Sequence, residues 1–299
     1  MDKRNESLNK NMIYKNEKLS KYNWFNLGGT AKVFFKPNSQ LDLSNFLKKH
    51  FEKEKNIYIL GAGSNTLFRD SGFDGIIIKL GKDFSYTKLL KDNKIEVGAA
   101  TLDKKVSDFA SQHSISGFEF LSCIPGTIGG AITMNSGCYG YDVSKIFFSL
   151  KAMNLNGEVK IFDKNQIEFF YRGSDFNKDL IILSVIFQGE PGNKGEIENK
   201  QARLINQKKE TQPSKIRTCG STFKNPESKK KAWELIKLTN CSNFVIGGAS
   251  ISPKHNNFFL NNGSATSSDI ETLIEKVKEE VFLKTGTKLE LEIKIVGGK

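Results

Sequence analysis

A short segment at residues 58–66, which reads YILGAGSNT, decides the fold of this chain. Its apolar first half predicts a buried strand, and the strand ends in two glycines separated by one residue. Glycine allows a backbone to turn with positive φ and to approach another molecule closely. Successive N–H groups in such a turn form a concave anion site, usually for phosphate. The segment alone fits a phosphate-binding loop or an ordinary turn equally well, because Thr66 stands where a dinucleotide fingerprint has its third glycine.

The segments around this turn predict a mixed α and β architecture. A strand at 31–35 precedes a helix that begins after Asn38 or Ser39. Strands at 76–78 and 94–97 follow, and then an amphipathic helix. The two helices have inner faces of apolar residues at helical spacing, which are Leu43, Phe46 and Leu47 in the first and Leu102, Val106, Phe109 and Ala110 in the second. This order lacks the regular strand–helix alternation of a doubly wound sheet.

The richest segment of the chain is 118–140, which reads FEFLSCIPGTIGGAITMNSGCYG. Its side chains are small over a long apolar stretch. Such a stretch suits a backbone that lies flat against a planar ligand, and it equally suits close helix packing, because both select glycine. Strands are predicted at 147–152, 159–162 and 180–187, and a polar segment at 189–196 marks the expected domain boundary.

The second half of the chain predicts a smaller α and β unit. A connecting helix at 195–209 leads to GSTFKNP at 220–226, a helix at 232–238 and KHNNFF at 254–259. A long helix then follows, for which Ser268 and Glu271 form the expected capping box and Gly286 the end. Its inner face is formed by Ile270, Leu273, Ile274, Val277 and Val281. A strand at 289–297 closes the chain. We therefore expect a polar segment at 1–21, a first domain at 22–191 and a second at 197–297.

Composition excludes several classes of protein. The 299 residues are 38% hydrophobic, enough for packed cores, and no apolar run is long enough to cross a membrane. The polar N-terminus has no signal core, and the four cysteines form no C-x-x-C pair, so we expect a protein of the reducing cytoplasm. Three histidines argue against a metal site. The net charge of +12 could attract a nucleic acid or a phosphorylated small molecule, but it is dispersed as a composition bias would produce, which argues against a nucleic-acid partner.

Six motifs, in order between Tyr22 and Gly297, resemble those of UDP-N-acetylenolpyruvoylglucosamine reductase (UDP-N-acetylmuramate dehydrogenase, the MurB family), a flavoenzyme of bacterial cell-wall precursor synthesis. The matching segments are G-x-G-S-N at Gly61–Asn65, I-P-G-T-x-G-G-A with N-x-G-x-Y-G at Ile124–Ala131 and Asn135–Gly140, Y-R-x-S at Tyr171–Ser174, G-S-x-F-K-N-P at Gly220–Pro226, K-H-x-N-F at Lys254–Phe258, and E-[VI]-[RK] at Glu292–Lys294.

This resemblance implies an α+β protein with an FAD-binding domain of the vanillyl-alcohol-oxidase (PCMH) type, followed by a smaller α+β substrate-binding domain. NADPH reduces a non-covalently bound FAD, and hydride then passes from flavin N5 to C3 of the enolpyruvyl group, with protonation at C2. Cofactor-binding positions carried over from the family are Gly61, Ala62, Gly63, Ser64, Asn65, Pro125, Gly126, Thr127 and Gly130.

The resemblance also assigns three catalytic residues. Hydride arriving at C3 pushes negative charge onto C2 and the adjacent carboxylate, so the chemistry needs a cation there, and Arg172 matches the family's residue. Ser221 matches the proton donor to C2, and Glu292 matches the acidic partner. The local sequence does not distinguish Glu292 from Glu290, two residues away on one expected strand face. Matching substrate-contact positions are Tyr171, Asn225 and His255.

Departures from the family pattern are few. Phe170 replaces a glycine before Tyr171, and cysteines at 123, 138 and 219 stand where small residues are frequent. The short interval between Arg172 and Ser221 resembles the form of the family without a tyrosine-bearing lid loop. We expect a monomer whose partners are UDP-N-acetylglucosamine enolpyruvate and NADPH. The alternative is an FAD-dependent alcohol or sugar oxidase of the same flavin fold, in which FAD is commonly tethered covalently.

Overall fold

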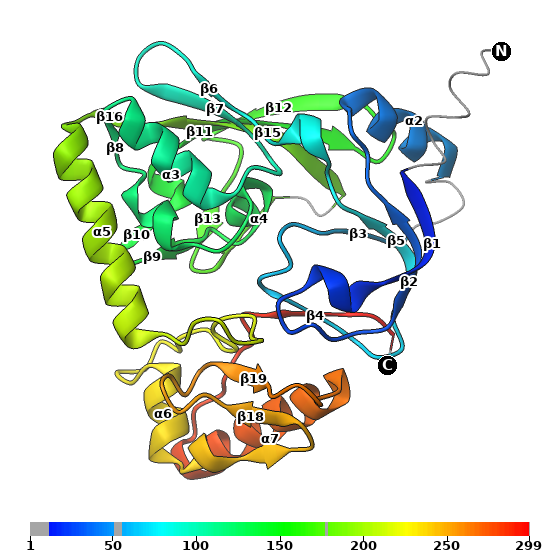
Figure 1. Cartoon of the computed structure of the whole chain (residues 1–299), viewed down its shortest axis with the longest axis vertical. Coiled ribbons are helices and arrows are strands. Elements are labelled where there is room, and N and C mark those ends of the chain that lie inside the picture. Colours follow the sequence, from blue (N-terminus) through cyan, green and yellow to red (C-terminus); the bar gives the residue numbers. More distant parts are fainter. Residues whose placement is uncertain (1–11, 51–55, 177–178, 299) are drawn as a thin grey trace. The chain divides into compact units, whose positions relative to one another are not determined.

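The computed structural model describes residues 12–50, 56–176 and 179–298, which fall into two units (Figure 1). The first unit contains Val33–Ala62 and Gly75–Lys208, together with the described residues up to Tyr14. The second contains Lys15–Lys32, Gly63–Asp74 and the chain from Lys209 onward.

This division differs from the domains expected at 22–191 and 197–297. The units separate at Lys208, inside helix α5 (Lys194–Thr211), and two early segments belong to the second unit. Composition identifies polar linkers, but it cannot show that two early segments of the chain belong to the second unit. Of the polar segment expected at 1–21, residues 1–11 lie outside the described chain, and Ile13–Lys18 forms strand β1.

The first unit is built around an antiparallel sheet with the order β12-β11-β15-β7-β6. Its strands are β6 (Thr87–Leu89), β7 (Lys94–Gly98), β11 (Phe147–Asn154), β12 (Val159–Asp163) and β15 (Leu180–Gln188). The central strand β15 is a nearly continuous apolar run, and its residues enter two hydrophobic clusters. A strand buried on both faces requires such a run. The strands predicted from apolar patterning are therefore confirmed.

One of these clusters lies beneath helix α2 (Gln40–His50) and a second sheet. That sheet has the order β1-β2-β5-β3, with β2 at Thr30–Phe35, β5 at Phe73–Ile78 and β3 at Ile57–Ile59. Strands β3 and β5 are parallel. Ser39 begins the helix, because its backbone N–H donates to Asp42 at 2.9 Å and its hydroxyl accepts from the Asp42 N–H at 3.1 Å. Of the two predicted caps, Ser39 is the correct one.

Helices α3 (Asp103–Gln112) and α4 (Ile128–Thr133) belong to the other cluster. Val106 and Ala110 are fully buried as predicted, but Leu102 is 46% exposed and lies outside the helix. Leu102 has an extended backbone and pairs with Thr127, so its side chain does not follow the helical face. Short paired strands complete the unit, which are β8 (Ile115–Ser116) with β16 (Glu190–Pro191), β9 (Gly137–Cys138) with β10 (Tyr141–Asp142), and β13 (Phe169–Phe170) with β14 (Gly173–Ser174).

In the second unit, helices α6 (Ala232–Leu238) and α7 (Ser267–Thr285) pack with a three-stranded antiparallel sheet (Figure 1). The sheet consists of β17 (Val245–Ile246), β18 (Ala249–Ile251) and β19 (Phe259–Asn261). The predicted inner face of α7 is confirmed, since all five of its apolar residues are fully buried. Gly286 ends α7 in the left-handed conformation at φ 68°, as predicted.

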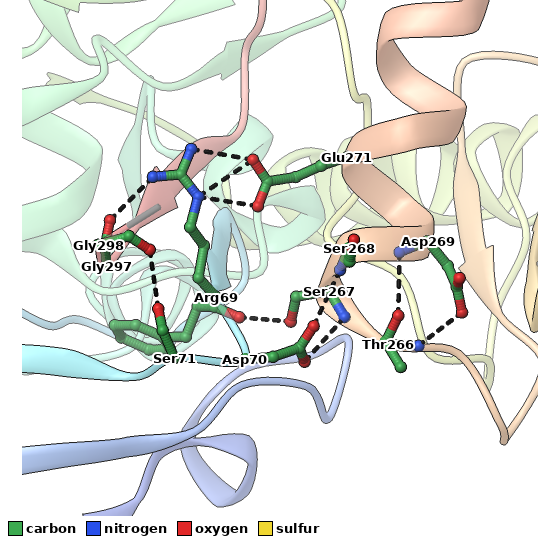
Figure 2. A network of polar contacts seen from close by, with 11 residues as sticks. Arg69, Asp70, Ser71, Thr266, Ser267, Ser268, Asp269, Glu271, Gly297 and Gly298 are labelled. Carbon is green, nitrogen blue, oxygen red and sulfur yellow. Dashed lines mark hydrogen bonds and ion pairs between the residues drawn. The ribbon is translucent and has the colours of Figure 1, made fainter.

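The capping box expected for α7 is wrong. Thr266 and Asp269 form it, with the Thr266 hydroxyl accepting from the Asp269 N–H at 3.0 Å and Asp269 accepting from the Thr266 N–H at 2.9 Å. The helix begins earlier than predicted because Asp70 accepts from the first N–H groups, those of Ser267 and Ser268, both at 3.0 Å (Figure 2). Such a tertiary contact leaves no trace in the local sequence.

The C-terminal segment is also shorter as a strand than predicted. Only β20 (Lys294–Val296) is a strand, and it pairs in parallel with β4 (Thr66–Phe68). The backbone at Glu290 and Glu292 instead bonds to the 222–224 segment: the Lys224 N–H donates to the Glu290 carbonyl and the Glu292 N–H donates to the Thr222 carbonyl, both at 2.9 Å. No helix within the described ranges has the length and apolar character needed to span a bilayer.

Candidate active site

The glycine loop after β3 is shaped by contacts that exclude side chains. Gly63 has φ 69°, and a Cβ there would overlap the backbone carbonyl of Tyr22. The Gly63 carbonyl accepts a hydrogen bond from the Trp24 N–H at 3.0 Å. A residue other than glycine would therefore strain the backbone and displace the 22–24 turn.

The Pro125–Thr127 segment lies beside this loop in the first unit. A Cβ on Gly61 would stand 2.6 Å from the Thr127 hydroxyl oxygen, and one on Gly130 would stand 3.7 Å from the same atom. The segment is also held at its middle residue, since the Gly126 carbonyl accepts from the Asp103 N–H at 3.2 Å. Gly61 therefore lets the two predicted cofactor segments pack closely against each other, because the Thr127 side chain stands where a Cβ at 61 would be.

Lys79 supplies a cation to this surface that sequence reasoning missed. It directly follows β5, and its ammonium group donates a hydrogen bond to the Gly61 carbonyl. Burial lowers the pKa of the Lys79 ammonium, and the neighbouring Lys36 adds to the effect. A half-buried cation beside a glycine loop fits a pyrophosphate. The sequence does contain one indication of this role, because Lys79 directly follows the apolar strand β5, which pairs with the strand β3 that precedes the glycine loop.

A buried carboxyl lies behind the same segment. Asp103 is fully buried, and within the described residues neither of its carboxyl oxygens has a hydrogen-bond partner. A Cβ on Gly126 would stand 2.6 Å from one of these oxygens. Burial raises the pKa of Asp103 well above its ordinary value. Asp103 therefore lies inside the protein, packed behind Gly126 of the predicted flavin segment.

Asn65, the last residue of the G-x-G-S-N motif, holds the C-terminal segment in the second unit. Its side-chain amide donates to the Glu292 carbonyl at 3.0 Å, and its own carbonyl accepts from the Lys294 N–H at 2.9 Å. Ala62 and Ser64, elsewhere in the motif, are half-buried. The motif therefore has a second task besides the one predicted, which is to fix the backbone that carries Glu292.

Arg69 fixes the other end of the same segment (Figure 2). Its guanidinium makes a forked ion pair with Glu271 of α7, with contacts of 2.9 and 3.1 Å, and donates to the Gly297 carbonyl at 2.9 Å. The Ser71 hydroxyl donates to the Gly298 carbonyl at 2.8 Å. Strand β20 is thus held on both sides, by Asn65 before it and by Arg69 after it.

Ser221 lies on a segment that is bonded on both edges within the second unit. Ser221 pairs with Phe258, and the next residue, Thr222, donates from its N–H to the Asn257 carbonyl at 2.8 Å. On the other edge, the Thr222 carbonyl accepts from the Glu292 N–H at 2.9 Å. The structure therefore brings the segments of Ser221 and Glu292 together through Thr222. Asn257, which sequence reasoning missed, closes the arrangement with two side-chain bonds to the Phe223 backbone, at 2.7 and 2.9 Å.

The two candidate carboxylates have different surroundings. The Glu290 side chain is 76% exposed and forms an ion pair with Lys224 at 3.6 Å. Glu292 is half-buried, and its backbone is held by both Asn65 and Thr222. A carboxylate that must keep one position is better supported at 292.

Tyr171 and Arg172 form the turn between β13 and β14 in the first unit. Arg172 is half-buried at φ 57°, a left-handed conformation that costs a non-glycine residue about 1–2 kcal/mol. Its guanidinium lies 5.3 Å from the centre of the Tyr171 ring, and the turn is held by Asn135, which donates to the Phe170 carbonyl at 3.1 Å. Strain of this kind persists where the surroundings fix a functional side chain.

Two predicted substrate residues have structural partners. Asn225 is exposed and its side-chain oxygen accepts from the Ala232 N–H at 3.2 Å, at the start of α6. His255 accepts from the Asn257 N–H at 3.3 Å and packs edge-on against Phe258. Burial lowers the pKa of His255, which favours the neutral ring. Of the remaining cofactor positions, Pro125 and Gly130 are exposed.

Comparisons with known proteins agree along the whole chain. A family model described as an FAD binding domain matches residues 31–163, and one for the C-terminal domain of UDP-N-acetylenolpyruvoylglucosamine reductase matches 212–296. The reductase of that name from Pelagibacter ubique (strain HTCC1062) is 50% identical over 280 residues, covering 93% of this chain and 92% of that protein. The one from Rickettsia prowazekii (strain Madrid E) is 42% identical over 290 residues, covering 95% and 97%.

A solved structure shows the same architecture. The crystal structure of the reductase from Thermus caldophilus is similar with a TM-score of 0.82 at 27% identity, covering 95% of this chain and 98% of that one. The predicted order of an FAD-binding domain and a substrate-binding domain is confirmed by the two family models. Because both domains match and the identity extends over nearly the full length of its relatives, the chain belongs to the UDP-N-acetylenolpyruvoylglucosamine reductase family.

Proposed function

We propose that this chain reduces UDP-N-acetylglucosamine enolpyruvate to UDP-N-acetylmuramate with NADPH, in the synthesis of peptidoglycan precursors. The observation that carries the proposal is the 50% identity to a reductase of that name over more than nine-tenths of both chains. The protein acts as a monomer in the cytoplasm, and the substrate is enclosed without a tyrosine-bearing lid loop.

FAD is held non-covalently by the two adjacent backbone segments, Gly61–Asn65 and Pro125–Thr127 with Gly130. When bound, it takes up hydride from NADPH and supplies it to the enolpyruvyl C3. The protein's part is to present backbone N–H groups and the Lys79 ammonium to the pyrophosphate, while glycines at 61 and 126 let the Thr127 and Asp103 side chains pack behind the loop. Asn65 contributes through its backbone, because its side-chain amide is bonded to Glu292.

Arg172 stabilises the negative charge that develops on the substrate carboxylate. A guanidinium carries its charge at every working pH and presents a planar fork that matches a carboxylate. The turn supports this role, because it holds Arg172 in one left-handed conformation against Tyr171. A cation already held in place pays no reorganisation cost when negative charge develops on the substrate.

Ser221 donates the proton to C2. A serine hydroxyl is a weak acid, but a carbanion-like enolate is a strong base, and transfer within hydrogen-bond reach is sufficient. The bonds from Thr222 to Asn257 and to Glu292 hold the segment that carries the hydroxyl. Glu292 acts as the acidic partner at the substrate carboxylate, and its more enclosed position favours it over Glu290.

Tyr171, Asn225 and His255 act on the substrate side. The exposed ring of Tyr171, 51% accessible, is available for direct contact. Asn225 and His255 order the loops around Ser221 through their bonds to Ala232 and Asn257. The test is an assay with purified enzyme, FAD, NADPH and UDP-N-acetylglucosamine enolpyruvate. Consumption of NADPH in step with formation of UDP-N-acetylmuramate supports the proposal, whereas NADPH consumption without that product, or with oxygen as sole acceptor, rejects it.

A further inference from the structure

Two of the four cysteines lie together in the first unit, next to the flavin segment. Cys123 ends the short 3₁₀ turn Glu119–Cys123, and Cys138 lies on β9, which packs against that turn. The Cys138 thiol donates to the Phe120 carbonyl of the same turn at 3.5 Å, which brings Cys138 to the turn that Cys123 ends. The Ser122 hydroxyl lies 3.7 Å from the Cys123 sulfur.

A lysine from helix α5 completes this cluster. The Lys208 ammonium donates to the Cys123 carbonyl at 2.6 Å. Burial lowers the pKa of Lys208, and the two nearby thiols act in the opposite sense. The neighbouring Cys138 thiol lowers the pKa of Cys123, with further help from Ser122 and Lys208, while burial opposes it. Thiolate is the reactive form of cysteine, and a neighbouring cation and hydrogen-bond donors favour it.

The other two cysteines differ from this pair in their neighbours and not in burial alone, since Cys123 is also buried, at 6% exposed, and Cys138 is half-buried. Cys219 is buried and lies 3.3 Å from the Thr66 carbonyl, and burial raises its pKa to about 12. Cys241 is buried beside the Thr239 hydroxyl at 3.1 Å, and burial raises its pKa as well. The chain therefore contains its own internal controls, which are two structural thiols in the same molecule.

We propose that Cys123 and Cys138 form a redox-active dithiol that a hydroperoxide oxidises to a disulfide. The Cys123 thiolate attacks a peroxide oxygen, the O–O bond breaks, and Cys123 becomes a sulfenic acid while hydroxide leaves. The Cys138 sulfur then attacks the Cys123 sulfur, the S–O bond breaks, and water leaves. Two thiols lose two electrons and two protons, and one hydrogen peroxide becomes two waters. A dithiol reductant restores the pair.

The position of this pair gives the modification a structural consequence. The disulfide closes a loop that contains Pro125–Thr127 and the whole of α4, the segment placed against the flavin. Cytoplasmic disulfides are usually transient and redox-sensing. The proposal does not depend on the reductase reaction, because it is read from the thiols themselves.

The first test compares the cysteines within the unmodified, FAD-loaded protein. Brief alkylation at neutral pH, followed by peptide mass mapping, is expected to label Cys123 at least about tenfold faster than Cys219 or Cys241. Equal labelling rates, or labelling of Cys123 only in denaturant, would overturn the assignment of Cys123 as the nucleophile.

The second test treats the same protein with a small excess of hydrogen peroxide. We expect the loss of two hydrogen atoms in the intact mass and a Cys123–Cys138 linked peptide, both reversed by dithiothreitol. The Cys138→Ser variant should accumulate a sulfenic acid at Cys123 that a dimedone probe traps, and the Lys208→Gln variant should react several-fold more slowly. Cys241→Ser is the matched control and should behave as the unmodified protein does. Oxidation of Cys123 to sulfinic acid without a linked peptide, or identical rates in Lys208→Gln, would reject the proposal.

Discussion

The side-chain amide of Asn65 donates to the backbone carbonyl of Glu292 at 3.0 Å, across 227 residues of sequence. The two residues belong to the motifs assigned to cofactor and catalysis, respectively. Their bond fixes the C-terminal segment at the point where β20 joins β4. Asn65, the last residue of the glycine motif, therefore holds the backbone of Glu292 in position.

Replacing Asn65 by alanine should slow turnover more than it weakens FAD binding. The loss of one hydrogen bond of about 1 kcal/mol corresponds to a decrease in kcat of about five- to tenfold. FAD affinity, measured by flavin fluorescence titration, should change by less than about threefold, since the backbone N–H groups remain. Asn262→Ala removes an exposed amide bonded to Ser250 and serves as the control. A large loss of FAD affinity with unchanged kcat would contradict this role.

The two C-terminal carboxylates can be separated by matched substitutions. Glu292→Gln should lower kcat by at least about tenfold, because it removes a charge from a position held by two backbone bonds. Glu290→Gln changes an exposed ion pair with Lys224 and should leave kcat within about twofold. Steady-state rates of the two variants provide the measurement, and the reverse order would mean that the carboxylate was assigned wrongly.

Lys79→Met should weaken FAD binding. Its half-buried ammonium stands at the Gly61 carbonyl, beside the proposed pyrophosphate site. A charge-assisted hydrogen bond is worth about 1.5–3 kcal/mol, which corresponds to an increase in Kd of about 10- to 100-fold. Titration of apoprotein with FAD provides the measurement, and exposed Lys82→Met is the control. Equal affinities in the two variants would place the pyrophosphate elsewhere.

Asp103 should make stability depend on pH. Burial raises the pKa of Asp103 in the folded protein. The contribution of Asp103 to the free energy of unfolding is therefore fully present below the unfolded pKa of about 4, and it is lost as the pH rises through the folded pKa. Asp103→Asn should therefore gain stability relative to the wild type between pH 5 and pH 8, as measured by urea unfolding of the apoprotein. Asp108→Asn, on the exposed side of α3 where Asp108 pairs with Lys104, is the matched control. A constant difference between wild type and Asp103→Asn would contradict a protonated, buried carboxyl.

Ser221→Ala should separate the two halves of the reaction. Reduction of the flavin by NADPH should keep its wild-type rate, because no proton from Ser221 is needed there. Reoxidation by the enolpyruvyl substrate should slow by about 10²–10⁴-fold, the usual contribution of a general acid. Stopped-flow absorbance follows both steps, and a near-normal reoxidation rate would remove Ser221 from the mechanism.

Periodicity and motif order predicted most of the fold, and contacts between distant segments account for the rest. The inner face of α7 follows from apolar spacing, but its first residue depends on Asp70, almost two hundred positions away. Likewise, Glu290 and Glu292 look equivalent in sequence, but Glu290 is exposed and paired with Lys224, whereas Glu292 is half-buried and bonded by Thr222 and Asn65.

The candidate site shows the same limit. The glycines predicted the loop, because few other residues tolerate a positive φ and a close approach of the backbone. The sequence does not predict that Lys79 lies at the glycine loop or that Cys123 and Cys138 lie close together. A lysine after a strand and two cysteines far apart in sequence are common, and only the fold brings them to these positions. The division into units could not be predicted either, because the early segments of the second unit have no distinctive composition.

The most direct test of the proposed function is the absorbance of the purified protein through one reaction cycle. The oxidised protein should be yellow and should release its flavin on denaturation. NADPH without substrate should bleach it, and anaerobic addition of UDP-N-acetylglucosamine enolpyruvate should restore the colour with one UDP-N-acetylmuramate formed per flavin. A protein that stays colourless when supplied with FAD, or whose reduced flavin is reoxidised only by oxygen, would contradict the account.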